Sequence, residues 1–234
     1  MTIPQQTPEL PALPHAQPGQ GFPLGEPLLY LRAIPDRRGR VISCSVENVY
    51  DQQIAVIVPA AGMPAWPTSR GHAELRFVMA SPAGAPLLYL TRLGGPFGRW
   101  ETQIMQVNDS YGRDLGRLRP TAPVAQFSHV DGITFGLEAN QRWLGATEVG
   151  QGPARAPRNP APIFDESGTA IAHIHRQELK RGDWGRYRMI FHDYLLDCPR
   201  AVPDPLPSLL VAAAFTQHLY AQLPQGTWQA MFPW

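Results

Sequence analysis

Short runs of alternating hydrophobic and polar residues fill most of the chain, and they come in pairs separated by turns that contain Gly or Asn. Alternation with period two is typical of strands that bury one face, and Gly or Asn adopts the positive φ that tight turns require. The pattern therefore predicts four antiparallel hairpins. Their strands are 77–79 with 87–92, 104–107 with 115–119, 133–137 with 143–147, and 162–164 with 170–176.

Four further apolar runs, at 28–31, 41–46, 54–58 and 186–191, bring the expected number of strands to about twelve. A sheet of this size tends to curl, and closure removes the exposed edges that would otherwise promote aggregation. A closed barrel of about twelve strands is wider than its own side chains can fill. The interior of such a barrel needs an additional element.

Residues 206–221 (LPSLLVAAAFTQHLYA) supply that element. A helix that is apolar nearly all round must be surrounded by protein, and about 20 apolar residues would be needed to cross a bilayer. We expect a core helix over 206–223, with Asp204 as its cap, Pro205 or Pro207 in its first turn, and Pro224 with Gly226 at its end. The predicted fold class is mainly β: a closed antiparallel barrel of about twelve strands around a hydrophobic C-terminal helix.

This fold divides the chain into three parts. Residues 1–25 contain six prolines and are expected to form a flexible arm, or a docking arm that orders on a partner. Residues 26–223 form the barrel domain with its central helix. Residues 224–234 form an aromatic tail, since large apolar groups at a terminus either fold back on the barrel or bind elsewhere.

The overall charge excludes one class of partner. Lys and Arg total 20 against 19 Asp and Glu, which gives a formal net charge of +1, so no long-range field would attract nucleic acid. The N-terminal segment lacks the cationic start and apolar run of a secretory signal, which indicates a cytoplasmic protein. Cys44 and Cys198 lie far apart without zinc-site spacing and are expected to be free buried thiols.

Two segments with a D-x-x-G turn, 108–119 and 165–176, followed by 186–191 and the terminal apolar helix, resemble the tubby-like C-terminal superfamily. The similarity extends over residues 26–223, and the branch that it suggests contains the phospholipid scramblases and LURP-one-related proteins. The resemblance implies a twelve-stranded barrel threaded by a C-terminal helix. It also implies that the protein binds lipids or phosphorylated headgroups and is a cytoplasmic protein at the periphery of a membrane.

The chain departs from the family in its functional residues. Tubby proteins bind phosphoinositides through Lys and Arg, whereas Lys180 is the single lysine here. Scramblases have a palmitoylated Cys-rich segment and an acidic calcium-associated stretch beside the last helix. In this chain the corresponding stretch offers Asp193 and Asp197, and the two cysteines form no cluster.

Three groups of residues are candidates for binding. Basic residues at the ends of the predicted hairpins would form an anion-binding face if the barrel brought those ends together. They are Arg92, Arg99, Arg117, Arg119, Arg176, Lys180 and Arg181. The tail offers Trp228, Met231, Phe232 and Trp234 as contacts for a protein partner. His173 and His175 alternate on one strand and could ligate zinc with His192 or Asp193, or simply face solvent.

These candidates lead to three hypotheses. The first is a non-enzymatic, tubby-like barrel that acts as an interaction or membrane-proximal adaptor through its arm or tail. The second is a module that binds lipid or a phosphorylated headgroup. The third is a metal-assisted enzyme that uses His173 and His175, although the chain contains no G-x-S-x-G, H-E-x-x-H or P-loop motif. No cofactor is predicted.

Overall fold

The computed structural model describes residues 20–34, 43–61, 74–93, 104–126, 129–150, 159–184 and 187–231. These residues form twelve longer strands, two helices and a small separate sheet. The helices are the short η1 (Pro23–Gly25) and the long α1 (Leu206–Met231), and the small sheet pairs β1 (Gln20–Gly21) with β14 (Val202–Pro203). The longer strands are β2 (Leu28–Ile34), β3 (Ser43–Glu47), β4 (Gln53–Pro59), β5 (Glu74–Ala80), β6 (Pro86–Leu93), β7 (Ile104–Asp109), β8 (Asp114–Gln126), β9 (His129–Ala139), β10 (Arg142–Gly150), β11 (Ala161–Asp165), β12 (Ala170–Trp184) and β13 (Tyr187–Asp197).

These twelve described strands close into one antiparallel barrel, as the alternating pattern predicts. They follow one another in chain order around the barrel, with β13 pairing with β2 and β9 with β10. Every predicted hairpin is present. Several strands extend beyond the predicted runs; β8 continues to Gln126 and β13 to Asp197, because pairing with a neighbour along the barrel wall carries them further.

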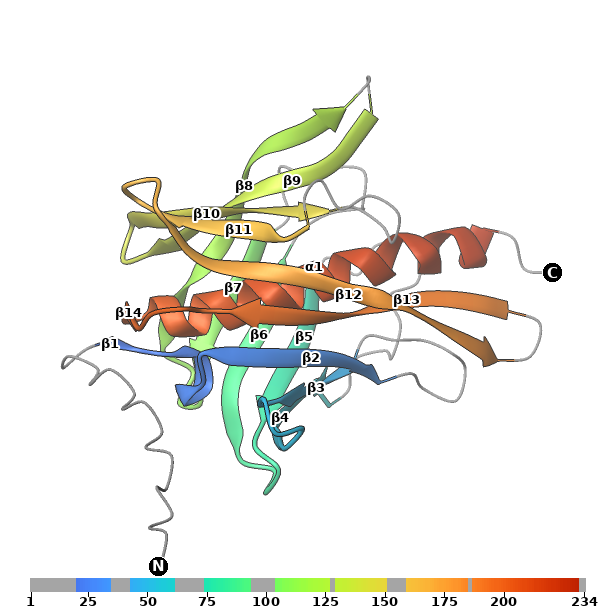
Figure 1. Cartoon of the computed structure of the whole chain (residues 1–234), viewed down its shortest axis with the longest axis horizontal. Helices are drawn as coiled ribbons and strands as arrows, with labels where there is room; N and C mark the ends of the chain where they lie inside the picture. Colours follow the sequence, from blue (N-terminus) through green and yellow to red (C-terminus); the bar gives the residue numbers. More distant parts are fainter. Residues whose placement is uncertain are drawn as a thin grey trace, which may run out of the picture.

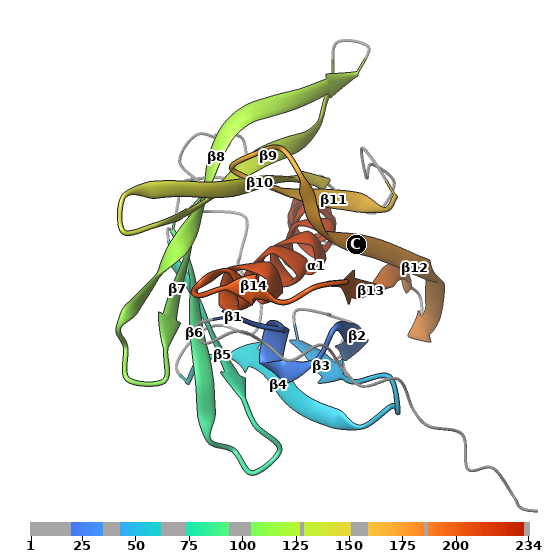
Figure 2. The same cartoon turned by 60° about the vertical axis from the view of Figure 1, so that its left-hand side comes forward.

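The helix α1 runs through the barrel, with strands on every side of it (Figures 1 and 2). From Leu209 to Ala221 each of its residues is at most 5% exposed. This burial confirms the predicted core helix. The predicted end was wrong, since α1 continues past Pro224 and Gly226 to Met231.

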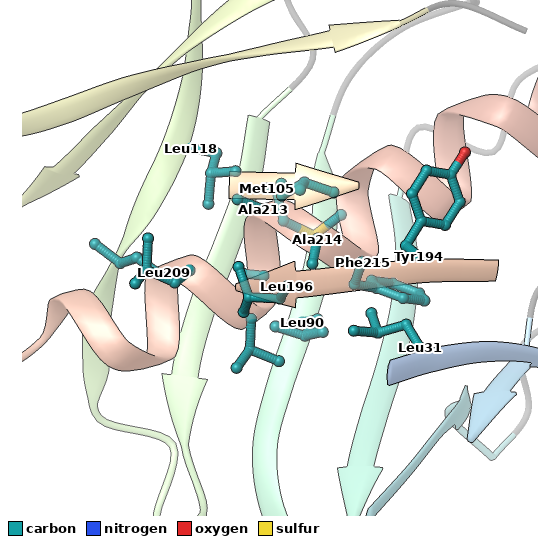
Figure 3. Packing of buried hydrophobic residues seen from close by; sticks show 14 of the residues in the cluster. Leu31, Leu90, Met105, Leu118, Tyr194, Leu196, Leu209, Ala213, Ala214 and Phe215 are labelled. Carbon is teal, nitrogen blue, oxygen red and sulfur yellow. The ribbon is translucent and has the colours of Figure 1, made fainter. Parts of the chain in front are cut away.

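The core forms where inward-facing residues of the strands meet the helix. On β5 and β6 every second residue is buried, and Phe77 of β5 and Leu90 of β6 face α1. Figure 3 shows Leu31, Leu90 and Leu196 of the barrel wall beside Phe215 of the helix. Small residues at Ala212, Ala213 and Ala214 let the wall approach the helix closely, and all three are fully buried.

The two ends of the barrel differ. The connections β3–β4, β5–β6, β7–β8, β9–β10 and β11–β12 are tight and lie at the end where α1 begins, which we call the turn end. At this end β1 pairs with β14, and Pro23 of η1 is buried beside the start of the helix. Residues 20–25, predicted as part of a flexible arm, therefore belong to the folded domain. Residues 1–19 lie outside the described part of the chain.

Candidate functional site

Four connections at the turn end share one hydrogen-bonded turn. Its first residue is Asn48, Ser81, Asp109 or Asp165, and the side-chain oxygen of that residue accepts a hydrogen bond from the backbone N–H four positions later. These N···O distances are 2.9–3.2 Å. The fourth residue of each turn has a positive φ of 55–83°, and Gly occupies that position in three of the four turns. The turns therefore hold their tips in fixed positions.

Two of these rigid tips carry exposed tyrosines. Tyr50 on the β3–β4 turn is 77% exposed, and Tyr111 on the β7–β8 turn is 84% exposed. The guanidinium of Arg113 lies over the Tyr111 ring, 5.5 Å from its centroid. Tyrosine and arginine are the residue types that dominate binding energy at protein interfaces. A tyrosine on a rigid turn also loses little conformational entropy when it binds.

An ion-pair network supports the base of the Tyr50 turn. The Nε of Arg32 lies 2.5 Å from Glu47, its Nη2 lies 2.6 Å from Asp51, and its Nη1 lies 4.0 Å from Asp193. Asp193 also accepts a hydrogen bond from the N–H of Ala33 at 3.0 Å. Partial burial by itself would lower the pKa of Arg32, but the hydrogen bonds and charges of Glu47 and Asp51 raise it. Asp193 is thus held in a structural contact between β13 and β2.

Inside the barrel, polar side chains interrupt the apolar core beside the second half of the helix. Arg92 points inward from β6, is 1% exposed and shares a hydrogen bond with Tyr220 of α1. Burial raises the pKa of Tyr220 to about 12, and the Arg92 charge opposes that rise. His218 is fully buried, with its ring 6.2 Å from Tyr194 and 6.1 Å from Phe215 between centroids. The sequence prediction placed Arg92 at a hairpin end, whereas it lies in the interior.

The predicted basic residues do not all lie on one face of the barrel wall. Arg117 and Arg119 point outward on β8, where Arg117 pairs with Glu138 at 2.9 Å. Arg176 of β12 continues the inward alternation of Ala172 and Ile174 and is the register partner of the buried Tyr194, so it faces inward; its backbone N–H donates to Asn159 at 2.8 Å. Lys180 and Arg181 also belong to β12, and Arg99 lies outside the described residues. Among the described side chains of this group, Arg92 and Arg176 thus lie on the inner face of the barrel wall, and Arg117 and Arg119 lie on the outer face.

His173 and His175 are neighbours on the outer face of β12, with ring centroids 6.3 Å apart. His175 Nε2 lies 3.9 Å from a carboxylate oxygen of Asp197. His192, predicted as a further metal ligand, is buried on β13, where its Nδ1 lies 3.1 Å from the carbonyl oxygen of Gln177. Over the described ranges no three His, Cys, Asp or Glu side chains lie close enough together to hold a metal ion.

The remaining candidates are the thiols and the tail. Cys44 and Cys198 are free and buried, as predicted. Trp228 and Met231 fall in the last turns of α1, while Phe232 and Trp234 lie outside the described residues. The described part of the chain contains no helix with the length and apolarity needed to cross a membrane. The exposed tyrosines on the turns were missed at the sequence level, although the repeated turn motif marks their positions.

Comparison with known proteins adds no relative: no family model matches the chain, and no curated protein or solved structure is significantly similar to it.

Proposed function

We propose that this chain is a non-enzymatic, tubby-like barrel that acts as a protein-interaction adaptor in the cytoplasm, near a membrane surface. The observation that carries the proposal is that the protein's own helix occupies the barrel interior. Leu209, Leu210, Val211 and Phe215 are all fully buried there. Any ligand then has to bind the outer surface or the ends of the barrel.

The turn end is the part of that surface best suited to a protein partner. Tyr50 and Tyr111 lie on turns whose backbone is fixed by side-chain hydrogen bonds, so they lose little conformational entropy on binding. The proline-rich N-terminus and the aromatic C-terminus are additional contact segments in this proposal. The acyl-chain form of the lipid-binding hypothesis has less support, because α1 fills the space that a chain would take.

The test is affinity capture from the native host, with quantitative mass spectrometry of both protein and lipid. Wild type is compared with a Tyr50→Ser/Tyr111→Ser variant, with a truncation of residues 225–234, and with a Thr121→Ser control on the exposed outer face of β8. The adaptor proposal expects a protein partner that the control retains and that the tyrosine variant or the truncation loses. A preparation that instead enriches anionic lipid, equally in all four proteins, would replace the adaptor with the lipid-binding alternative.

A further inference from the structure

The outer face of β8, β9 and β10 has a flat aromatic platform. Trp143 of β10 is 41% exposed, and its ring lies directly on the backbone of Gly136 in β9. A Cβ atom at Gly136 would be only 2.0 Å from the Cζ3 of Trp143. The absence of a side chain at position 136 therefore lets the indole lie against the sheet, with one face held by protein and the other toward solvent.

Arg119 lies beside this platform. It is the register partner of Gly136 across β8 and β9, and its side chain is exposed. No carboxylate of the described residues lies within ion-pairing distance of Arg119. This distinguishes it from six other arginines, each of which has a carboxylate oxygen within 4.0 Å. They are Arg32, Arg76, Arg113, Arg117, Arg142 and Arg200.

The opposite side of the same barrel carries the complementary charge. β3 is six strands from β9 in the closed order, whichever way the barrel is followed. There the β3–β4 turn presents Tyr50 and, next to it, Asp51, which is 75% exposed. Asp51 and Glu47 place two carboxylates against the guanidinium of Arg32, so the described residues of this turn are acidic.

We propose that the platform of Trp143 and Arg119 binds the Tyr50–Asp51 turn of a second copy of this chain. Asp51 has one carboxylate oxygen engaged by Arg32, which leaves the other for the guanidinium of Arg119 in the neighbouring copy. Tyr50 supplies an aromatic surface for the indole of Trp143. A net charge of +1 gives little repulsion between copies. Because the two sides differ and are opposite, the contact is heterologous, and a row of copies can extend.

The test is sedimentation velocity of the full-length protein over a wide range of concentrations. We expect the wild type to associate beyond a dimer, and added salt to weaken that association because the pairing charges are near the surface. Arg119→Glu and Asp51→Asn each remove one side of the contact, and each should weaken association by at least about tenfold. Asn is chosen at position 51 because that residue has a φ of 55°, which Asn accepts.

Mixing the two variants makes the test specific. Arg119→Glu retains the acidic turn and Asp51→Asn retains the platform, so an equimolar mixture should form pairs that cannot extend further. Arg76→Glu, an exposed change on β5 beside Ala60, at the other end of β4 from the Tyr50–Asp51 turn, is the matched control and should associate like the wild type. Thermal melts establish that each variant is folded. A wild type that stays monomeric, variants that associate undiminished, or a mixture that forms no pairs would each overturn the proposal. A monomeric wild type would leave the platform to a different acidic partner.

Discussion

Phe215 of α1 packs edge-on against Phe77 of β5, with ring centroids 4.9 Å apart and ring planes at 70°. Both side chains are at most 2% exposed, so this contact joins the helix to the barrel wall in the middle of the core. Aromatic pairs in this geometry contribute about 0.5–1.5 kcal/mol beyond the burial of their surfaces. The helix is thus held by specific packing as well as by exclusion of water.

Replacing Phe215 by Ala should lower the free energy of unfolding by about 3–5 kcal/mol, because it removes this contact and leaves a cavity that the barrel wall cannot close. Urea denaturation followed by fluorescence measures the change. Tyr111→Ala removes an aromatic ring of similar size from an 84% exposed position, and it should alter the unfolding free energy by less than about 0.5 kcal/mol. Equal effects at the two positions would contradict the central placement of the helix.

A carboxylate at Ala213 should unfold the protein. The Ala213 side chain is fully buried within the barrel, and an unpaired charge there costs several kcal/mol. The matched control is Ser208→Asp, which puts the same group in the first turn of α1, where the helix dipole favours negative charge and the site is only partly buried. Circular dichroism melts should show loss of the folded state for Ala213→Asp and little change for Ser208→Asp. A folded Ala213→Asp protein would show that the helix is not enclosed.

Most of this architecture could be predicted from the alternation of residues, because each hairpin and the apolar helix carry a local signal. The interior position of Arg92 follows from the same alternation, since Leu88, Leu90 and Arg92 occupy every second position of β6. Its charge nevertheless suggested a solvent-facing site. The basic residues at the hairpin ends do not all share a face, because successive residues of a strand point to opposite sides of the barrel wall.

Other features depend on tertiary contacts and leave no local signal. Residues 20–25 are ordered because β1 pairs with β14, and because Pro23 is buried near the helix. A proline-rich composition by itself indicates an extended arm. The helix end also differs from its local signal: the prediction relied on Pro224 and Gly226 as helix breakers, and α1 continues through both. The platform at Trp143 depends on its meeting Gly136 on the neighbouring strand, which only the register determines.

Two glycines should respond differently to substitution by Ala. At Gly145 a Cβ would be 2.1 Å from the backbone oxygen of Phe164, which cannot move without breaking the β10–β11 pairing. At Gly136 the obstacle is the Trp143 side chain. Both changes should destabilise the protein. The Gly136→Ala/Trp143→Ala double variant should recover much of the Gly136→Ala loss, while Gly145→Ala/Trp143→Ala should be additive. Denaturation of the three single variants, Trp143→Ala included, and of the two double variants measures the coupling. Additivity at both positions would contradict the stacked indole.

The Asp165 turn should make stability depend on pH. Hydrogen bonds from the Ser167 hydroxyl and from the backbone N–H groups of Thr169 and Ser167 lower the pKa of the Asp165 carboxyl. Its contribution to stability is therefore complete above the unfolded pKa of about 3.9, and is lost as the pH falls through the lower folded pKa.

Asp165→Asn keeps the acceptor oxygen and removes the charge, as Asn48 already does in the equivalent turn. The unfolding free energy of the wild type should consequently fall more steeply than that of the variant over this acidic range. Ser167→Ala should raise the carboxyl pKa toward its ordinary value, which an NMR titration reads directly. Parallel pH profiles for wild type and Asp165→Asn would exclude this role of the turn.

The two cysteines should report on different opening motions. Burial raises the pKa of the Cys198 thiol to about 11, and burial together with the Asp193 charge raises the pKa of Cys44 well above its usual range. A thiol reagent should therefore label neither residue in the native protein at neutral pH, because thiolate is the reactive form.

Cys198 lies just beyond β13, where local opening of the chain would expose it. Cys44 lies within β3, paired on both sides, and should become reactive only on global unfolding. Labelling of the Cys44→Ala and Cys198→Ala variants at increasing urea separates the two rates. If Cys44 reacts as early as Cys198, the barrel must open between β2 and β4 without losing its core.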